Sequence, residues 1–353
     1  MFFTSSPSPR TKRALRVPTP TLHPFKSADG LDLLLTRYRG GDKGPVMLVH
    51  GLGVSSLIFS IDTIDTNLVE YLVDKGFDVW LLDYRSSIGL PAARTQYSAD
   101  VLAKDDLPRA VEEISAATGS KGIQVVGHCY GGTTFTMAML AGMQGVRSAV
   151  ISQISAHVNT PPLVGFKSGL RTPEALEKLG IWSLDASPAK PERLSDRLLD
   201  VALRLYPVEF EEQCSSNVCR RITFMYSLLY EHDQLNEQTH DALGEMFGAA
   251  TMTAFDGLAK MVRAGHITDA HGFDVYLPHL DRLAIPMRFI HGAENQCYQP
   301  ESTARTLAAL QAHNNPALYS RVVIPNYGHI DCIFGKNAAR DVYPHITEHL
   351  EKT

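Results

Sequence analysis

The amino-acid sequence predicts an α/β fold with a mostly parallel central sheet and one helical insertion. Two uninterrupted apolar stretches, residues 45–51 and 123–127, are typical of strands inside a sheet that is covered on both faces. Helical patterns follow the strands repeatedly, as in sheets whose parallel strands are connected by helices. This alternation stops near residue 156 and resumes near residue 283. The stretch between is therefore expected to form a helical cap.

The first part of the chain combines a leader with regular alternation. Residues 1–20 are rich in Ser, Pro and basic residues, a composition that cannot bury a core, and are expected to be a flexible leader. The elements expected next are a strand at 31–38 after the Asp29-Gly30 turn, a strand at 45–51, a helix at 68–75 ending at Gly76, a strand at 77–84, a helix from Ser98 to near Gly119, a strand at 123–127, a helix from Thr133 and a strand at 146–154.

The second part begins with the expected cap, residues 156–282. Its pattern is mostly helical, with turns expected at the prolines at positions 161, 162, 173, 188, 191 and 207. A strand at 285–292, a helix at 300–312, a strand at 321–325 and a terminal helix are expected to follow. Residues 21–155 and 283–353 would then form one core.

Composition and charge exclude several classes of partner. The 353 residues are 44% hydrophobic, and the net charge of -5 gives no electrostatic reason to expect nucleic acid or an anionic membrane. No run approaches the roughly 18 apolar residues that span a bilayer, and the N-terminus lacks the apolar core of a secretory signal. The five cysteines are an odd number, so at least one thiol is unpaired and a reducing compartment is favoured. We expect a cytoplasmic protein without a transmembrane segment.

The stretch around Cys129 carries the strongest chemical signal. An apolar strand ends at Gly127 and passes through His128, Cys129 and Tyr130 into Gly131 and a helix. Glycines two residues before and after a side chain permit a sharp elbow that lifts this side chain above the sheet. The helix N-terminus behind it favours a thiolate and a developing oxyanion. Cys129 is therefore the candidate nucleophile, and the alternative is a buried cysteine without chemistry.

These residues resemble the acid-lipase branch of the α/β-hydrolases, with Cys129 in place of the nucleophilic serine. The likeness covers roughly residues 20–350 and is weakest in the cap. Besides the elbow, it includes His50-Gly51-Leu52-Gly53 and the stretches 76–81 and 329–335.

A closer likeness is to the hydrolase module attached to bacterial glucose-methanol-choline oxidoreductases of the cholesterol-oxidase type. It includes residues 230–236 and 326–343. This resemblance implies a setting near sterol or other hydrophobic alcohol metabolism, with an oxidoreductase as partner. The N-terminal part of the chain lacks the glycine fingerprint of flavin binding, so oxidoreductase activity is not expected.

Acyl transfer requires a nucleophile, a base, a group that orients the base, and donors for the oxyanion. The resemblance places the base at His329, after the last strand. The backbone amides of Leu52 and Tyr130 are expected to form the oxyanion hole. His50 and His128 are expected to take part in substrate binding.

The group that orients His329 is either Glu294 or Asn295. Related lipases carry aspartate three positions after the glycine that ends the preceding strand, which corresponds to Asn295 here. Glu294 lies one residue earlier and has a longer side chain. Because a carboxylate stabilises an imidazolium by charge as well as by orientation, Glu294 is preferred. Asn295 is the alternative, since asparagine partners the cysteine–histidine pair of papain-like proteases.

No cofactor and no metal site are expected. Cys214 and Cys219 lie close in the sequence, but no second Cys/His pair follows at the spacing of zinc sites. Two free thiols are therefore preferred over a disulfide or half of a metal site. Cys297 and Cys332 flank the loops of the acid and the base, and are expected to pack.

Three functions remain open. The first is a cysteine-dependent esterase or lipase-like hydrolase that cleaves a hydrophobic, lipid or sterol-like ester through a thioester on Cys129. Thioesters also react with amines, alcohols and carbon nucleophiles, so an acyltransferase or cyclase that excludes water is the second. The third is a non-catalytic module that binds a lipid or a partner protein. The cap residues that indicate an apolar substrate are Phe166, Trp182, Phe210, Phe224, Met225, Tyr226, Phe247 and Met252.

Overall fold

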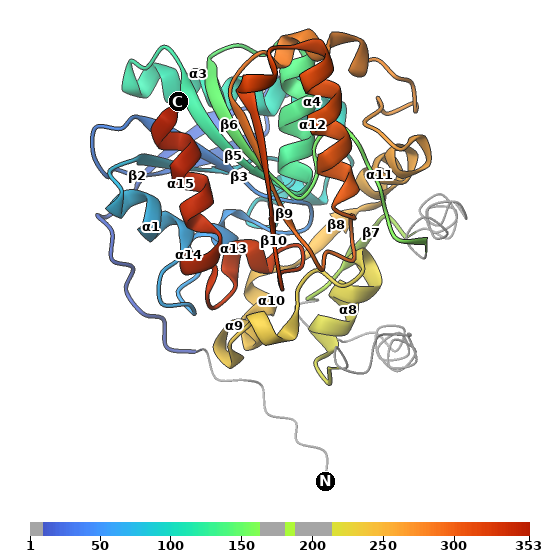
Figure 1. Ribbon diagram of the computed structural model, residues 1–353. Coiled ribbons are helices and arrows are strands. Elements are labelled where there is room, and N and C mark those ends of the chain that lie inside the picture. Colours follow the sequence, from blue (N-terminus) through green and yellow to red (C-terminus); the bar gives the residue numbers. More distant parts are fainter. Residues whose placement is uncertain (1–9, 163–180, 188–213) are drawn as a thin grey trace.

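The computed structural model describes residues 10–162, 181–187 and 214–353. Within them, eight strands form one sheet in the order β1-β2-β4-β3-β5-β6-β9-β10 (Figure 1). β2 is antiparallel to β1 and to β4, and all other neighbours are parallel. The strands are β1 (Thr21–Lys26), β2 (Asp32–Tyr38), β3 (Pro45–Val49), β4 (Asp78–Asp83), β5 (Ile123–His128), β6 (Val146–Ser152), β9 (Met287–Gly292) and β10 (Tyr319–Ile324). The expected α/β fold with a mostly parallel sheet is confirmed.

Helices cover both faces of this sheet. α1 (Leu68–Asp74) and α15 (Tyr343–Lys352) pack together on one face, while α3 (Leu107–Thr118), α4 (Tyr130–Ala141) and α12 (Glu301–His313) lie on the other (Figure 1). Every residue of β3 and β5 is consequently buried, which explains their mostly apolar sequences. α4 is buried on all sides from its first residue to Leu140, as its evenly apolar sequence requires.

The other elements of the core are short. They are η1 (Ser56–Phe59), η2 (Pro91–Arg94), α2 (Ala99–Val101), the π-helical turn η3 (Leu102–Asp106), η6 (Leu277–Leu283), η7 (Pro316–Leu318), α13 (Asp331–Phe334) and α14 (Ala338–Asp341).

The chain leaves the sheet after β6 and returns at β9, so the insertion expected from the sequence is present. Its described elements are β7 (Ser183–Asp185), α8 (Asn217–Tyr226), η5 (His232–Gln234), α9 (Glu237–Asp241), α10 (Leu243–Met246), β8 (Ala249–Thr251) and α11 (Met252–Ala264). β7 and β8 pair as an antiparallel ribbon that the sequence pattern did not predict. Phe166 and Phe210 of the predicted apolar cap residues lie outside the described residues.

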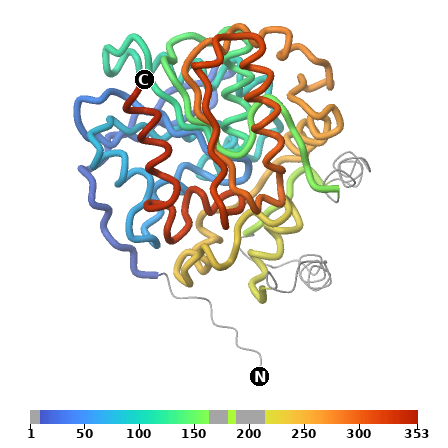
Figure 2. Tube along the Cα trace, viewed as in Figure 1, coloured from blue at the N-terminus to red at the C-terminus, as the bar shows by residue number. Residues whose placement is uncertain are grey.

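The N-terminal segment differs from the expected flexible leader. From Arg10 onward it runs along the surface beside α1 (Figure 2). The Arg13 guanidinium makes a two-pronged ion pair with Glu70 (2.6 and 2.7 Å), and Arg10 does the same with Asp62 (2.8 and 2.6 Å). Basic residues that favour disorder in isolation are here fixed by buried or half-buried carboxylates of the core.

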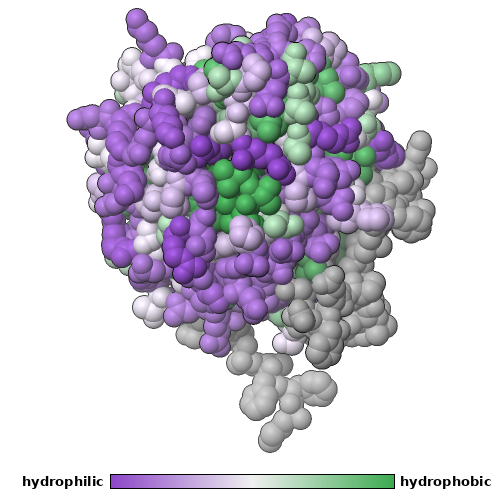
Figure 3. Space-filling view, in the orientation of Figure 1, coloured by the Kyte–Doolittle hydropathy of each residue, from purple (hydrophilic) through white to green (hydrophobic). Residues whose placement is uncertain are grey.

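The surface agrees with a protein that exposes mainly polar groups. The face seen in Figure 3 is mostly hydrophilic, with an apolar patch over β10. β10 has a neighbouring strand on one side only, and Val323 is 37% exposed. Among the described residues, no helix is both long and apolar enough to cross a bilayer.

Candidate active site

Cys129 occupies a sharp turn between β5 and α4. Its backbone angles, φ 55° and ψ -128°, lie in a region that non-glycine residues rarely adopt. The Cys129 amide donates to the carbonyl of Ser152 on β6 (3.0 Å), and the Cys129 carbonyl accepts from the amide of Thr133 (3.1 Å). The sheet and the helix therefore hold the strained turn in place.

Glycines are required on both sides of the turn. A Cβ at Gly127 would lie 2.9 Å from the Cα of Gly132, and a Cβ at Gly131 would collide with the carbonyl oxygens of Val49 and His50. The elbow therefore packs backbone against backbone. This local requirement explains the glycine pattern seen in the sequence.

The Cys129 thiol lies beside the N-terminus of α4 and against the loop after β3. The backbone amides of Tyr130, the first residue of α4, and of Leu52, in that loop, each lower the pKa of this thiol. Cys129 is partly exposed as a residue, but burial of its sulfur raises the thiol pKa to about 12, and the amides oppose only part of this rise. Burial therefore raises the thiol pKa by more than the helix N-terminus lowers it, and the predicted thiolate is not the favoured form of Cys129. The amides of Leu52 and Tyr130 both act on the sulfur, and their role as an oxyanion hole stays a prediction.

His329 lies on the loop between β10 and α13 and is 1% exposed. Its ring is 5.0 Å, centroid to centroid, from that of His128, the neighbour of Cys129. Burial, with His128 and His291 nearby, lowers the pKa of His329 well below its ordinary value. Among the described residues, Nε2 of His329 has no hydrogen-bond partner. The structure thus brings an uncharged imidazole beside the elbow.

Asn295 sets the tautomer of His329. The Oδ1 atom of Asn295 accepts hydrogen bonds from the amides of Cys297 (2.9 Å) and Tyr298 (3.0 Å), which fixes the orientation of the side-chain amide. Its Nδ2 group donates to Oε1 of Gln153 (2.9 Å) and faces Nδ1 of His329 (3.0 Å). Since Nδ1 accepts this hydrogen bond, the proton of the neutral imidazole is on Nε2.

The preference for Glu294 as the orienting residue needs correction. Glu294 is exposed, and its backbone amide donates to the carbonyl of Tyr327 (2.9 Å). Asn295, 4% exposed, is the residue whose side chain reaches His329. The turn after β9 directs consecutive side chains in different directions, and the longer side chain of Glu294 points to solvent.

The two histidines expected to take part in substrate binding are fully buried. Nδ1 of His50 bonds to the carbonyl of Gly51 (2.8 Å), and Nδ1 of His128 to Oγ of Ser152 (3.3 Å). Burial lowers the pKa of His128 to about 3, with a further contribution from His50. Burial lowers the pKa of His50 as well, so neither buried ring favours the charged form.

Comparison with known proteins identifies the family of this chain. The sequence profile described as "Alpha/beta hydrolase family" matches residues 46–342, from β3 to the start of the last helix. The chain belongs to the α/β hydrolase family.

The relatives of this α/β hydrolase include lipases. Triacylglycerol lipase 1 of Arabidopsis thaliana is 25% identical over 351 residues, which covers 93% of this chain and 86% of the relative. Human lysosomal acid lipase/cholesteryl ester hydrolase is 33% identical over 125 residues, 31% of each chain. Among solved structures, the monoacylglycerol lipase of Paleococcus ferrophilus has a TM-score of 0.58 and 15% identity, covering 91% of this chain and 99% of that one. The structural likeness shows the shared fold.

A segment of the cap holds the His329 loop of this hydrolase. The carbonyl of Leu229 accepts hydrogen bonds from the amides of His329 (3.0 Å) and Ile330 (2.7 Å). The carboxylate of Asp331 accepts from the amides of Gly328 (2.9 Å) and, on the cap, Glu231 (3.1 Å). Burial raises the pKa of Asp331 to about 7, although these amides counteract the effect. Neither Asp331 nor Leu229 was identified from the sequence, because both contacts join distant segments.

Two tyrosine hydroxyls near the elbow are buried without a hydrogen-bond partner among the described residues. They belong to Tyr130 on α4 and to Tyr226 on the cap helix α8. The Tyr226 hydroxyl approaches Gly53 so closely that any Cβ there would collide with it. Of the remaining cysteines near the site, Cys332 is fully buried and Cys297 is 7% exposed, in line with the expected packing roles.

Proposed function

We propose that this α/β hydrolase cleaves an ester of a hydrophobic, lipid or sterol-like substrate with Cys129 as nucleophile. The observation that carries the proposal is the strained elbow that holds the Cys129 sulfur against the amides of Leu52 and Tyr130. The names of the relatives, triacylglycerol lipase and cholesteryl ester hydrolase, support an ester with a large apolar part.

In the proposed reaction, the substrate carbonyl oxygen takes the position at the two amides, and the sulfur moves to the carbonyl carbon. The bond from sulfur to carbon forms while the thiol proton passes to Nε2 of His329. The ester C–O bond then breaks, and the alkoxide takes this proton, which leaves a thioester on Cys129. Water attacks the thioester by the reverse proton path, releases the acid and restores the thiol.

The resting arrangement of His329 opposes the first of these proton transfers. Because Asn295 donates to Nδ1, the Nε2 atom already carries a proton and has no lone pair for the thiol. The proposed cycle therefore begins with two linked changes. The Asn295 side-chain amide rotates so that Oδ1 faces Nδ1, and the imidazole exchanges protons with solvent, losing the proton on Nε2 and gaining one on Nδ1. This rotation breaks the two hydrogen bonds from the amides of Cys297 and Tyr298. We infer that turnover is slow compared with a hydrolase that has a carboxylate at this position.

The setting is part of the proposal. All five cysteines lie in the described ranges and none forms a disulfide, which supports a reducing compartment such as the cytoplasm. The proposed substrate class also fits the sterol or hydrophobic alcohol setting, with an oxidoreductase as partner, that the sequence resemblance implies.

The test is intact-mass spectrometry of the purified protein during incubation with p-nitrophenyl butyrate and p-nitrophenyl palmitate. We expect an acyl adduct that maps to Cys129, and steady release of p-nitrophenol with faster turnover of the longer ester. Cys129→Ala should form no adduct. Glu294→Gln is the matched control, because this exposed side chain does not reach His329, and it should keep the wild-type rate.

The alternatives give different time courses. A single burst of p-nitrophenol, followed by turnover only when an alcohol or amine is added, would replace hydrolysis by acyl transfer. Absence of any adduct on Cys129 with both esters would overturn the proposal in favour of a non-catalytic binding module.

A further inference from the structure

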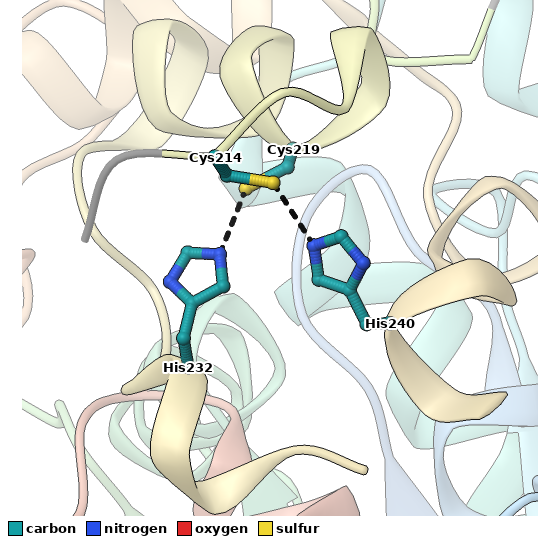
Figure 4. Close-up of side chains that lie close together, drawn as sticks. All are labelled: Cys214, Cys219, His232 and His240. Carbon is teal, nitrogen blue, oxygen red and sulfur yellow. Dashed lines mark hydrogen bonds between the residues drawn. The ribbon is translucent and has the colours of Figure 1, made fainter. Parts of the chain in front are cut away.

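Four side chains of the cap gather into a second cluster, away from the elbow. The cap cluster consists of Cys214, Cys219, His232 and His240, and one ligand atom from each residue lies within 4.8 Å of all the others. Sγ of Cys214 is 3.2 Å from Nε2 of His240, and Sγ of Cys219 is 3.4 Å from Nε2 of His232 (Figure 4). Neither cysteine forms a disulfide, as expected, but two histidines whose sequence spacing gave no sign of a shared site lie beside them.

These atoms match the donor set and the spacing of a zinc site. Two thiolates and two imidazoles are a typical ligand set of structural zinc. With Zn–S bonds of about 2.3 Å and Zn–N bonds of about 2.0 Å, a tetrahedral zinc ion holds sulfur and nitrogen about 3.5 Å apart. We propose that the cap cluster binds a zinc ion. This site is independent of the proposed chemistry at the elbow.

The surroundings of the cap cluster give a metal ion access from the surface and four protein ligands. Cys214, His232 and His240 line an open hollow of about 380 Å³ at the surface, while Cys219 lies behind them and is 2% exposed. The backbone amide of Ser216 donates to Sγ of Cys214 (3.3 Å), a contact that stabilises a metal-bound thiolate. Four protein ligands leave no position for a substrate, so the zinc would be structural.

The ligands come from three short elements that the metal would join. Cys214 lies just before α8 and Cys219 is in its first turn, while His232 is in η5 and His240 is in α9. Short helices of this length have little stability of their own, and a shared ion supplies a strong cross-link between them.

The cross-link would also bear on the His329 loop. His232 follows directly after Leu229–Glu231, the segment that binds the His329 loop through the carbonyl of Leu229 and the amide of Glu231. Gln234, at the end of η5, donates to the carbonyl of Asn326 (2.8 Å) and accepts from the amide of Lys336 (2.7 Å). Zinc would thus fix the cap segment against which the catalytic loop is packed; this consequence rests on the proposed function.

The experiment measures the metal content of the full-length protein expressed with zinc in the medium. We expect inductively coupled plasma mass spectrometry to find about one zinc ion per chain. Cys219→Ser and His240→Ala should each lose most of it. His271→Ala replaces an exposed histidine outside the cluster and should keep the ion. Cys129→Ala should also keep it while losing acyl-adduct formation, which separates this inference from the proposed function.

Two further measurements do not depend on the folding of a variant. Chelation should lower the melting temperature of the wild type, and added zinc should restore it. Cobalt substitution should give the intense visible absorption of a tetrahedral thiolate site, weakened in Cys219→Ser. A wild-type protein with no bound zinc and no response of its melting temperature to zinc or chelator would overturn the inference. A disulfide between Cys214 and Cys219 in the freshly purified protein would do so as well.

Discussion

At the scale of single residues, the hydrogen bonds of Asn295 decide which nitrogen of His329 carries the proton. An aspartate at this position could accept the amides of Cys297 and Tyr298 with one oxygen and Nδ1–H of His329 with the other. The imidazole would then present a free lone pair at Nε2. Asparagine, held by the same two amides, can only donate to Nδ1.

Asn295→Asp should therefore increase esterase activity. We expect kcat/KM for p-nitrophenyl esters to rise by about tenfold or more, since the tautomer that accepts the thiol proton becomes the resting state. The same change places a carboxylate oxygen against Oε1 of Gln153, now 2.9 Å from Nδ2, so the melting temperature should fall. Faster turnover with lower stability is the expected signature. A loss of activity, with the thiol still present, would contradict the assigned orientation of Asn295.

Some of these residues could be predicted from the sequence because they lie in contiguous motifs. The elbow around Cys129 places Tyr130 next to the sulfur by chain connectivity alone, and the glycines require that turn. The choice between Glu294 and Asn295 could not be made in this way. It depends on the direction in which a turn projects two consecutive side chains, and on the amides of Cys297 and Tyr298 that hold Oδ1.

At the scale of secondary-structure elements, the His329 loop is held by a buried carboxyl group. Asp331 is 0% exposed, and its oxygens accept the amides of Gly328, Glu231 and Cys332. Burial nevertheless dominates and raises its pKa from 3.8 to about 7. The folded state therefore binds the proton more tightly than the unfolded state, and this group favours folding most below pH about 4.

The stabilising effect of Asp331 should decline as the pH rises from about 4 to about 7. The free energy of unfolding of the wild type, compared with Asp331→Asn at each pH, should fall over this window by up to about 4 kcal/mol and then stay constant. The comparison cancels the titration of all other groups. Urea denaturation at pH 5, 6, 7 and 8 measures it. A difference that does not change with pH, or grows with pH, would show that the carboxyl is not protonated in the fold.

The segment before β1 is attached to the core by the ion pair between Arg13 and Glu70. Burial alone would raise the pKa of Glu70, yet the Arg13 guanidinium and the amides of Arg16 and Asn67 lower it to about 2. Glu70 is thus a buried carboxylate that needs its partner.

Arg13→Ala should consequently destabilise the protein by about 1–3 kcal/mol, because Glu70 loses two charged hydrogen bonds. Lys12→Ala is the neighbouring control. Its ion pair with Glu245 is exposed, so the expected cost is below about 0.5 kcal/mol. Thermal or urea unfolding compares the two variants, and equal costs would refute the anchoring role of Arg13.

Elements inside the sheet were the easiest to predict. Central strands such as β3 and β5 are mostly apolar because helices cover both faces. β1 was missed because it is an edge strand with mostly exposed residues, including Pro24, and has no apolar run. The order seen in residues 10–20 was missed for a related reason: their contacts are ion pairs with residues far along the chain, which local composition does not reveal.

At the scale of the whole molecule, the site is formed where the cap meets the core. Core elements supply Cys129, Leu52 and Asn295, but the cap supplies the carbonyl of Leu229 and the hydroxyl of Tyr226.

The zinc ligands proposed in the cap could not be predicted from sequence spacing. His232 and His240 are further apart in sequence than the histidines of most zinc sites, and only the packing of short cap elements brings them to the two cysteines.

The contribution of the cap to the candidate active site can be tested at Tyr226. Its hydroxyl is buried against the Gly53 loop with no hydrogen-bond partner among the described residues, which costs stability in the absence of substrate. We expect Tyr226→Phe to stabilise the protein by about 1 kcal/mol and to lower kcat/KM for ester substrates by about tenfold, because the hydroxyl is available to a polar group of the bound ester.

Tyr319→Phe is the matched control, since its hydroxyl donates to the carbonyl of Leu283 (2.8 Å) and its loss should destabilise the protein by about 1 kcal/mol without changing kcat/KM. Melting temperatures and steady-state kinetics of both variants decide the matter. If Tyr226→Phe were less stable than the wild type and equally active, the hydroxyl would be part of the packing of the cap and would have no role toward substrate.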